Sequence, residues 1–273
     1  MKGRLSIVST PIGHLGDFSF RGVETLKDAA VIACEDTRHT RRLLTHYGIE
    51  ARLVSLHAHT SGAAIERLLD RVDAGEHVAY VTDAGTPGIS DPGGMLVERA
   101  HARGFTVVPV PGPSAVLAAL VASGFPADKF IFLGFLPRKG GARTGLLQRI
   151  AAERFTSVCY EAPGRTAALL ADLARECGPE REGVVARELT KLHEEIRRGT
   201  LADLAAYYEE HPARGEVTVV IEGTRAAAKA MSAAPETDAA APPATAERPS
   251  DAAKELSRRL GISRQDAYRL LNR

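Results

Sequence analysis

The chain has 273 residues, of which 44% are hydrophobic and 25% are charged, and this balance is typical of a soluble globular protein rather than a disordered chain. At about 150 residues per domain, the length predicts two domains. The 35 Lys and Arg residues against 34 Asp and Glu residues give a formal net charge of +1, so any surface that binds nucleic acid must be local.

Signals for export, membrane insertion and disulfide bonding are weak. Three cysteines are too few for a disulfide framework or a Cys-rich zinc site. The apolar run at the N-terminus ends at Pro11, which is too short for a signal peptide, and no apolar run reaches the roughly 20 residues of a membrane span. We therefore expect a cytoplasmic protein with no membrane partner.

The first half of the chain alternates short β-branched runs with helical periodicity. Ser19 and Thr37 stand where they would cap two of the helices, and a further helix is expected at Met95–Arg103. Strands separated by helices indicate a parallel, doubly wound α/β sheet. The five expected strands are 5–8, 31–33, 53–56, 78–81 and 107–110.

A second α/β series follows the rigid Pro111-Gly112-Pro113 break, and Ser114 stands where it would cap a helix at 115–122. We expect an N-terminal α/β domain at 1–113 and a C-terminal α/β domain with a mixed sheet at 114–225, with a ligand cleft between them. The expected strands of the second domain are 130–135, 157–160, 183–187 and 217–222, and its expected helices include 167–175 and 201–209.

The C-terminal part has a different composition. Residues 226–249 are dominated by Ala, Pro, Thr and Glu, which predicts a flexible linker. Residues 250–273 have the spacing of two short helices around a tight turn, as in a helix-turn-helix. From Arg248 onward there are seven basic and three acidic residues, which fits either a solvated helical appendage or a module that binds RNA phosphates. The expected RNA-binding residues are Arg258, Arg259, Arg264 and Arg269.

Four unusual segments follow strands of the first sheet, where ligands of doubly wound folds bind. The segment at 82–94 is dense in Gly, Pro and Asp, so its backbone can approach a ligand closely. At 110–115 a helix begins, and its first N–H groups can bind a carboxylate or a ribose oxygen. The segment at 10–17 is also rich in Gly and Pro. These three segments predict a small-molecule site.

The fourth segment, 34–40, combines two carboxylates, an arginine and a histidine. It fits a catalytic or substrate-orienting loop, and the alternative is a structural Asp–Arg pair with Thr37 as helix cap. No phosphate-binding loop, dinucleotide-binding turn, HExxH or CxxC motif is present. His57 and His59 alternate after a strand as surface residues do, and we expect no metal.

These segments, in this order, resemble the tetrapyrrole-methylase superfamily, the class III S-adenosylmethionine-dependent methyltransferases, and more narrowly its branch that acts on small-subunit ribosomal RNA. His14 stands where that branch commonly has Asn, and it can still donate a hydrogen bond. Pro11 and Ile12 interrupt the G-x-G-x-G-D turn of the wider superfamily, which favours the RNA-directed branch. The matching motifs are 9–17, 35–40, 83–93, 110–115, 160–165 and 187–191.

The resemblance implies S-adenosylmethionine-dependent 2′-O-methylation of a cytidine ribose in small-subunit (16S) rRNA, by a homodimer that holds the cofactor between two α/β domains. The partner is the rRNA or the assembled small subunit. Carried over motif by motif, the cofactor-binding residues are Leu15, Asp83, Gly85, Thr86, Ile89, Ser114, Ala115 and Ala162.

Removal of the 2′-hydroxyl proton requires a base, and Glu35, Asp36, His39 and Glu161 are candidates. We expect Asp36, beside Glu35, to orient or deprotonate the hydroxyl, while Arg38 binds a neighbouring phosphate bidentately. Two alternatives remain open. One is a methyltransferase of the same superfamily that acts on a tetrapyrrole, another small molecule or a protein. The other is a non-catalytic regulator that binds nucleic acid.

Overall fold

The computed structural model describes residues 3–56, 62–91 and 93–224, together with 257, 263, 265 and 266. The chain separates into two units, Met1–Arg225 and Ala226–Arg273. The expected linker, the helical appendage with its four arginines, and His57 and His59 therefore lie outside the described residues, apart from isolated positions. The boundary at Pro113 stays a prediction.

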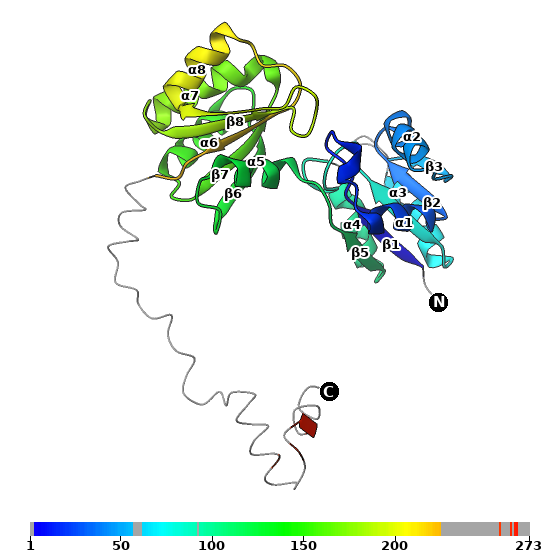
Figure 1. Cartoon of the computed structure of the whole chain (residues 1–273). Coiled ribbons are helices and arrows are strands. Elements are labelled where there is room, and N and C mark those ends of the chain that lie inside the picture. The colour runs from blue at the N-terminus through cyan, green and yellow to red at the C-terminus, as the bar shows by residue number, and fades with distance from the viewer. Residues whose placement is uncertain are drawn as a thin grey trace. The chain divides into compact units, whose positions relative to one another are not determined.

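The first sheet is entirely parallel, as the alternation of strands and helices predicts (Figure 1). Its strand order is β3-β2-β4-β1-β5. The interior strand β2 is fully buried, and so are four of the five residues of β4, because helices cover both faces of such a sheet. The strands are β1 (Arg4–Val8), β2 (Val31–Cys34), β3 (Leu53–Ser55), β4 (His77–Val81) and β5 (Thr106–Val110).

Two separate apolar cores confirm that this sheet is doubly wound. Helices α3 (Gly62–Asp73) and α4 (Gly93–Ala102) pack on one face, and α1 (Phe20–Lys27) and α2 (Thr37–His46) pack on the other. Ser19 caps α1 as expected, since its Oγ accepts a hydrogen bond from the Gly22 N–H. The expected cap of α2 is wrong: Asp36, and not Thr37, is its N-cap, because the Asp36 carboxylate reaches the Arg38 N–H.

The second sheet is mixed, with the order β6-β7-β10-β8-β9. Only the β6–β7 pair is parallel. Its strands are β6 (Phe130–Phe135), β7 (Thr156–Glu161), β8 (Glu182–Arg187), β9 (Glu195–Thr200) and β10 (Val217–Ile221).

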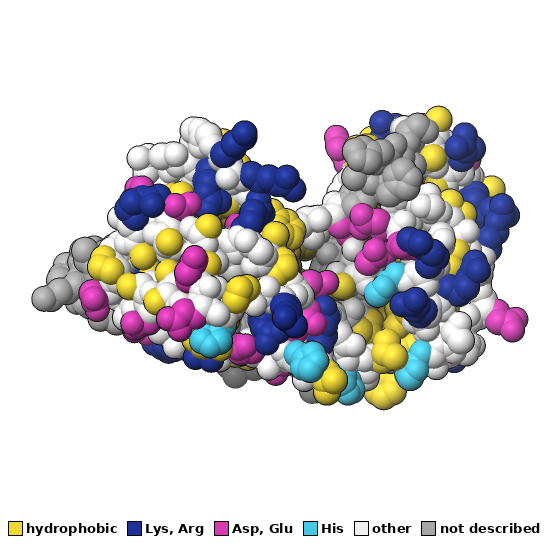
Figure 2. Space-filling model, turned by 90° about the horizontal axis from the view of Figure 1, so that it is seen from above, with side chains coloured by type: hydrophobic (Ala, Val, Ile, Leu, Met, Phe, Trp, Pro, Cys, Tyr) yellow, Lys and Arg dark blue, Asp and Glu magenta, His cyan; other side chains and the backbone are white. Residues whose placement is uncertain are grey.

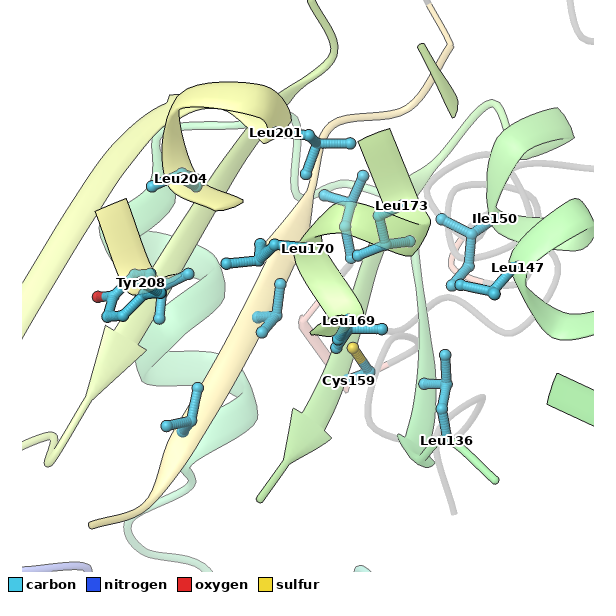
Figure 3. Close-up of a cluster of buried hydrophobic side chains, with 14 residues drawn as sticks. Leu136, Leu147, Ile150, Cys159, Leu169, Leu170, Leu173, Leu201, Leu204 and Tyr208 are labelled. Carbon is cyan, nitrogen blue, oxygen red and sulfur yellow. The ribbon is translucent and has the colours of Figure 1, made fainter. Parts of the chain in front are cut away.

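Helices cover both faces of this sheet as well. Helix α5 (Ala115–Ser123) lies on one face, with Val116, Ala119 and Leu120 in the core. The other face carries the larger core shown in Figure 3, in which Leu169, Leu170 and Leu173 pack against Cys159 and Leu201. The helices on that face are α6 (Gly141–Ala152), α7 (Thr166–Cys177) and α8 (Leu201–Glu210).

Two elements of this half have no counterpart in the sequence-based expectation. Helix α6 begins at a Gly-Gly pair without a side-chain cap and buries only Leu147 and Ile150, so its periodicity is weak. Strand β9 reads Glu-Ile-Arg-Arg-Gly-Thr and lies at the sheet edge, where one side stays in solvent. Short one-turn helices η1 (Leu15–Asp17) and η2 (Pro163–Arg165) complete the described elements. Among these residues, no helix has the length and apolarity to cross a membrane.

Candidate functional site

A cavity of about 430 Å³ lies where the first-sheet loops meet residues of the second sheet. Its volume is within the roughly 300–1,000 Å³ range of small-molecule sites. We call it the donor pocket. Its lining residues are Ile12, Glu35, Thr82–Thr86, Ile89–Asp91, Ser114, Ala115, Phe135, Tyr160–Pro163 and Gly215–Thr218.

Backbone hydrogen bonds and hydroxyl groups join three first-sheet loops at this pocket. Thr10 and Gly85 exchange two backbone hydrogen bonds, of 2.9 and 3.1 Å, which connect the loops after β1 and β4. The Thr86 hydroxyl then donates to the Pro113 carbonyl oxygen at 3.1 Å, just before α5. The loops are therefore fixed relative to one another without a ligand.

The loop after β4 adopts backbone angles that explain its glycines. Gly85 has φ +82° and Gly88 has φ +87°, in the left-handed region that side chains disfavour. Ser90 has φ +60° without being glycine, a strain of about 1–3 kcal/mol that the surrounding structure must hold in place. The Asp91 carboxylate does so by accepting hydrogen bonds from the Gly88 and Gly93 N–H groups at 2.7 and 2.6 Å.

The donor pocket is acidic. Its lining contains five carboxylate residues and no Lys, Arg or His among the described residues. The fully buried Tyr80 side chain lies close to these charges: burial first, and then Asp91 and Glu35, raise the pKa of its hydroxyl. Such a pocket favours a ligand with positive charge. The five residues are Glu35, Asp83, Asp91, Glu161 and Glu216.

Glu161, at the end of β7, is the most deeply buried of these carboxylates, with 2% of the residue exposed. Its Oε1 accepts a hydrogen bond from the Ala162 N–H at 2.7 Å and pairs with Arg165. Its Oε2 is buried and has no hydrogen-bond partner among the described residues. An unsatisfied buried carboxylate oxygen is costly, so this atom is suited to accept a hydrogen bond from a ligand.

The structure brings together seven of the eight residues expected to bind the cofactor, and all seven line the donor pocket. Leu15 is the exception. It lies in a neighbouring hollow of about 580 Å³ beside α2, which we call the α2 hollow. Ser114 is the N-cap of α5 as expected, so the first N–H groups of that helix open beside the pocket.

The expected catalytic residues divide between these two places. Glu35 lines the donor pocket and Arg38 lines the α2 hollow. Asp36 lines neither, but its N–H donates to the Asp83 carboxylate at 3.1 Å. Both Asp36 carboxylate oxygens accept hydrogen bonds from the Arg38 guanidinium, at 3.1 and 2.7 Å. These bonds, together with the Arg38 N–H, hold the pKa of Asp36 well below its usual range.

The loop after β8 contacts the loop after β1. The Thr190 hydroxyl accepts a hydrogen bond from the His14 N–H at 3.0 Å. The Nδ1 atom of the His14 imidazole accepts a hydrogen bond from the Gly16 N–H at 3.1 Å and caps η1, which leaves Nε2 as the donor of the neutral ring. An Asn side-chain oxygen can cap a helix in the same way, so the His in this position preserves the local structure.

Sequence reasoning included Tyr160 in a matching motif without assigning it to the site, and it missed the part of the pocket formed by Phe135 and the segment 215–218. Residues 215–218 stand at the amino end of β10, which is antiparallel to β7 and places Val217 opposite Glu161. The only signal in the sequence is Gly215, which has φ +77°. In the described part of the chain, no three His, Cys, Asp or Glu side chains form a group that could hold a metal ion.

Comparisons with known proteins agree with this geometry. The family described as Tetrapyrrole (Corrin/Porphyrin) Methylases matches residues 4–205. The Ribosomal RNA small subunit methyltransferase I of Xylella fastidiosa is 50% identical over 223 residues, covering 81% of this chain and 82% of that protein. The protein of the same name from Mesorhizobium japonicum is 44% identical over 269 residues, covering 98% of this chain and 90% of that protein.

Solved structures show the same fold at lower identity. A cobalt precorrin-4 methyltransferase of cobalamin biosynthesis has a TM-score of 0.62 at 19% identity, covering 80% of this chain and 94% of its own. A uroporphyrin-III C-methyltransferase from Thermus thermophilus, complexed with S-adenosylhomocysteine, has a TM-score of 0.57 at 22% identity. The match covers 81% of this chain and 97% of that one. The chain therefore belongs to the tetrapyrrole (corrin/porphyrin) methylase family and, within it, to the methyltransferases named ribosomal RNA small subunit methyltransferase I.

Proposed function

We propose that the protein transfers a methyl group from S-adenosylmethionine to the 2′-hydroxyl of a cytidine ribose in small-subunit (16S) rRNA. The observation that carries this proposal is the acidic donor pocket, in a chain that is 50% identical over 223 residues to a protein named Ribosomal RNA small subunit methyltransferase I. The nucleotide and the 2′-oxygen are implied by the sequence motifs of the family.

The pocket residues fit the cofactor. S-adenosylmethionine carries a sulfonium and an ammonium group, so five carboxylates around it favour its binding over that of a neutral analogue. The free Oε2 of Glu161 is suited to a cationic or N–H donor. The N-terminus of α5 at Ser114 and Ala115 is suited to the carboxylate end of the cofactor, because unpaired N–H groups attract an anion.

The main task of the chain is alignment. When bound, S-adenosylmethionine supplies a methyl group that its sulfonium already activates. The residues of the pocket would hold the 2′-oxygen in line with the methyl group and its sulfur, and a base of this chain would take the hydroxyl proton as the methyl group moves from sulfur to oxygen. Rigid loops that hold both partners can supply up to about 7–11 kcal/mol, and the joined loops at Thr10, Gly85 and Thr86 provide this rigidity.

The residue that accepts the proton of the 2′-hydroxyl has to be assigned separately. Asp36 is a weak proton acceptor in this arrangement, because Arg38 occupies both of its oxygens and lowers its pKa. We propose that the Asp36–Arg38 pair orients the target nucleotide at the pocket edge. Glu35 and Glu161 line the pocket and stay candidates for accepting the proton, and His39 is exposed on α2.

The partners follow from this activity. A protein that modifies rRNA meets its substrate, the rRNA or the small ribosomal subunit, in the cytoplasm. We also propose a homodimer, supported by an apolar surface on α5, where Leu117 and Val121 are 52% and 72% exposed. The arginines Arg258, Arg259, Arg264 and Arg269 remain a proposal as further RNA contacts.

The test is to map ribose methylation in small-subunit rRNA, base by base, in cells with and without the gene. We expect one cytidine to lose its 2′-O-methyl group in the deletion strain and to regain it when purified protein and S-adenosylmethionine are added to isolated subunits. An unchanged map, with labelled methyl groups appearing in a tetrapyrrole or a protein instead, would favour the alternative methyltransferases. Binding of duplex nucleic acid with no methyl transfer would favour a regulator.

Asp36→Asn is the variant that tests the orienting pair. Because Asn cannot form a bidentate ion pair with Arg38, we expect turnover to fall about 10²-fold or more, with nearly unchanged affinity for S-adenosylhomocysteine. Both quantities are measured on the purified variant, by methyl incorporation into isolated subunits and by calorimetry. Unchanged turnover would refute the role of Asp36.

A further inference from the structure

One face of α2 presents basic side chains to solvent. Arg38, Arg41, Arg42, Thr45 and His46 follow the spacing i, i+3, i+4, i+7 and i+8, which places them on the same side of the helix, and all five are exposed. The opposite side of α2 is buried through Leu43 and Leu44. The helix is therefore anchored by its apolar side and offers a row of cations.

These side chains, with Leu15 and Thr37, line the α2 hollow. No carboxylate residue is part of this lining among the described residues, although the whole chain is nearly neutral at +1. Arg38 pairs with Asp36, whereas Arg41 and Arg42 form no ion pair with any described residue. Figure 2 shows that Lys and Arg side chains gather in groups on the face in view instead of alternating evenly with acidic ones.

Contacts within the chain hold the α2 hollow in shape. The Tyr47 hydroxyl, just after α2, donates a hydrogen bond to the Leu15 carbonyl oxygen. The rings of Tyr47 and Phe18 meet edge to face, with centroids 5.3 Å apart. At the other end of the helix the Asp36 N–H donates to the Asp83 carboxylate at 3.1 Å, so both ends of α2 are tied to loops that follow strands of the first sheet.

The hollow is adjacent to the donor pocket along the chain. Glu35 lines the pocket, and Thr37 and Arg38, two and three residues later, line the hollow. The lining of the donor pocket contains carboxylates and no Lys, Arg or His among the described residues, so it offers no cation to the phosphates of an RNA strand. A strand that places a ribose near Glu35 therefore requires cations directly beside the pocket, and α2 supplies them.

We propose that the α2 hollow is an RNA-backbone site, in which Arg41 and Arg42 bind phosphodiesters of the nucleotides that flank the methylated one. This inference rests on the proposed function, since it takes rRNA as the substrate. Leu15, which the sequence motifs place at the cofactor, becomes the apolar wall of this site.

The experiment compares the double variant Arg41→Ala/Arg42→Ala with Arg67→Ala. Arg67 is an exposed residue of α3 that lines no described cavity and forms no ion pair with a described residue, so Arg67→Ala controls for the loss of a positive charge elsewhere on the surface. A third protein, Arg41→Lys/Arg42→Lys, keeps the charges. Binding to isolated small subunits from the deletion strain is measured with S-adenosylhomocysteine present, between about 50 and 200 mM salt at constant magnesium.

We expect the Ala double variant to bind at least about tenfold more weakly at low salt, and the slope of log affinity against log salt to become shallower by about 1.4–1.8 units, because two phosphate contacts are lost. The Lys variant and Arg67→Ala should keep the wild-type slope. All three should bind S-adenosylhomocysteine like the wild type.

A slope of the Ala double variant equal to that of Arg67→Ala would overturn the proposal, and so would wild-type binding that does not depend on salt. Binding is read without methyl transfer, so the two hypotheses fail separately. If the wild type binds subunits with the expected slope and the double variant does not, but no ribose becomes methylated, the proposed function is refuted and the RNA-backbone site stands.

Discussion

The two sheets contribute to the donor pocket in different ways. All strands of the first sheet run parallel, so the carboxyl ends of β1, β2, β4 and β5 lie at the same edge, and each is followed by a loop that belongs to the site or borders it. The second sheet is mixed, so its site edge combines the carboxyl ends of β6 and β7 with the amino end of β10. The first sheet therefore supplies most of the pocket and the second supplies a wall.

The means of stabilisation differ as well. The first-sheet loops are held by backbone hydrogen bonds and close contacts at glycines, such as the Thr10–Gly85 bridge. The second sheet and its helices rely more on ion pairs, such as Arg187–Glu195 at 3.0 Å and Arg143–Asp172 at 2.8 Å. We therefore test the stability of the first half by adding a Cβ atom at a glycine, and the stability of the second half by breaking an ion pair and changing the pH.

The largest effect is expected at Gly93, the first residue of α4. A Cβ atom there would lie 2.4 Å from Cε1 of the buried Tyr80 ring and 2.9 Å from the Asp91 carboxylate. We expect Gly93→Ala to lower the free energy of unfolding by about 3 kcal/mol, the upper part of the usual range for overpacking. We also expect it to weaken binding of S-adenosylhomocysteine, because Asp91 lines the pocket.

Its neighbour Gly94 provides the control, since a Cβ atom there meets nothing within 4 Å. Because Ala favours a helix over Gly, Gly94→Ala should be neutral or more stable by up to about 1 kcal/mol. Urea unfolding measures both variants. If Gly93→Ala and Gly94→Ala had the same free energy of unfolding, the close contact at Gly93 would not limit the stability of the first half.

A smaller effect is expected at Asp172 in α7. Its carboxylate accepts hydrogen bonds from Arg143 at 2.8 and 3.1 Å and from Arg175 at 2.6 Å. Burial opposes ionisation of Asp172, but the bonds from the two arginines outweigh it and lower its pKa. We expect Asp172→Asn to lower the free energy of unfolding by about 1–2 kcal/mol at pH 7 and to leave cofactor affinity unchanged.

The pH dependence has a definite sign. Because the pKa of Asp172 is lower in the folded state, its stabilisation is complete above the unfolded value of about 3.9 and is lost as the pH falls through the folded pKa. The difference between wild type and Asp172→Asn should therefore be constant near neutral pH and shrink below about pH 4. Asp128→Asn, a change at an exposed carboxylate, is the control. A difference that grows in acid would contradict the argument.

The same contrast explains how much of the molecule could be predicted. The strands of the first sheet are continuous apolar runs such as Val31–Cys34, so their existence and their parallel arrangement are visible in the sequence. Strand β9 carries charged residues that become partners only after folding, as Glu195 does with Arg187. Most of the site follows from motifs after parallel strands, but residues 215–218 lie at the amino end of an antiparallel strand, where no such rule applies.

Only the structure shows which residues of the segment 35–38 line the donor pocket and which lie outside it. Glu35, Asp36 and Arg38 are nearly consecutive, and the sequence alone groups them in one catalytic or substrate-orienting loop. The start of α2 separates them, because Glu35 lines the donor pocket, Asp36 caps the helix, and Arg38 is exposed on its surface. The direction of side chains at a helix start is set by the cap, which sequence spacing does not reveal.

The most direct test is a calorimetric titration of the pure protein with S-adenosylhomocysteine, repeated with Gly85→Ala and Gly48→Ala. Both glycines have positive φ, of +82° and +60°, so both variants strain the backbone, but only at Gly85 would the new Cβ meet a pocket residue, Cγ2 of Ile12 at 3.3 Å. We predict one site per chain in the wild type and in Gly48→Ala, and at least about a tenfold loss of affinity, or about 1.4 kcal/mol, in Gly85→Ala. No heat of binding in the wild type, or equal affinity in all three proteins, would contradict a donor site built on the loop after β4.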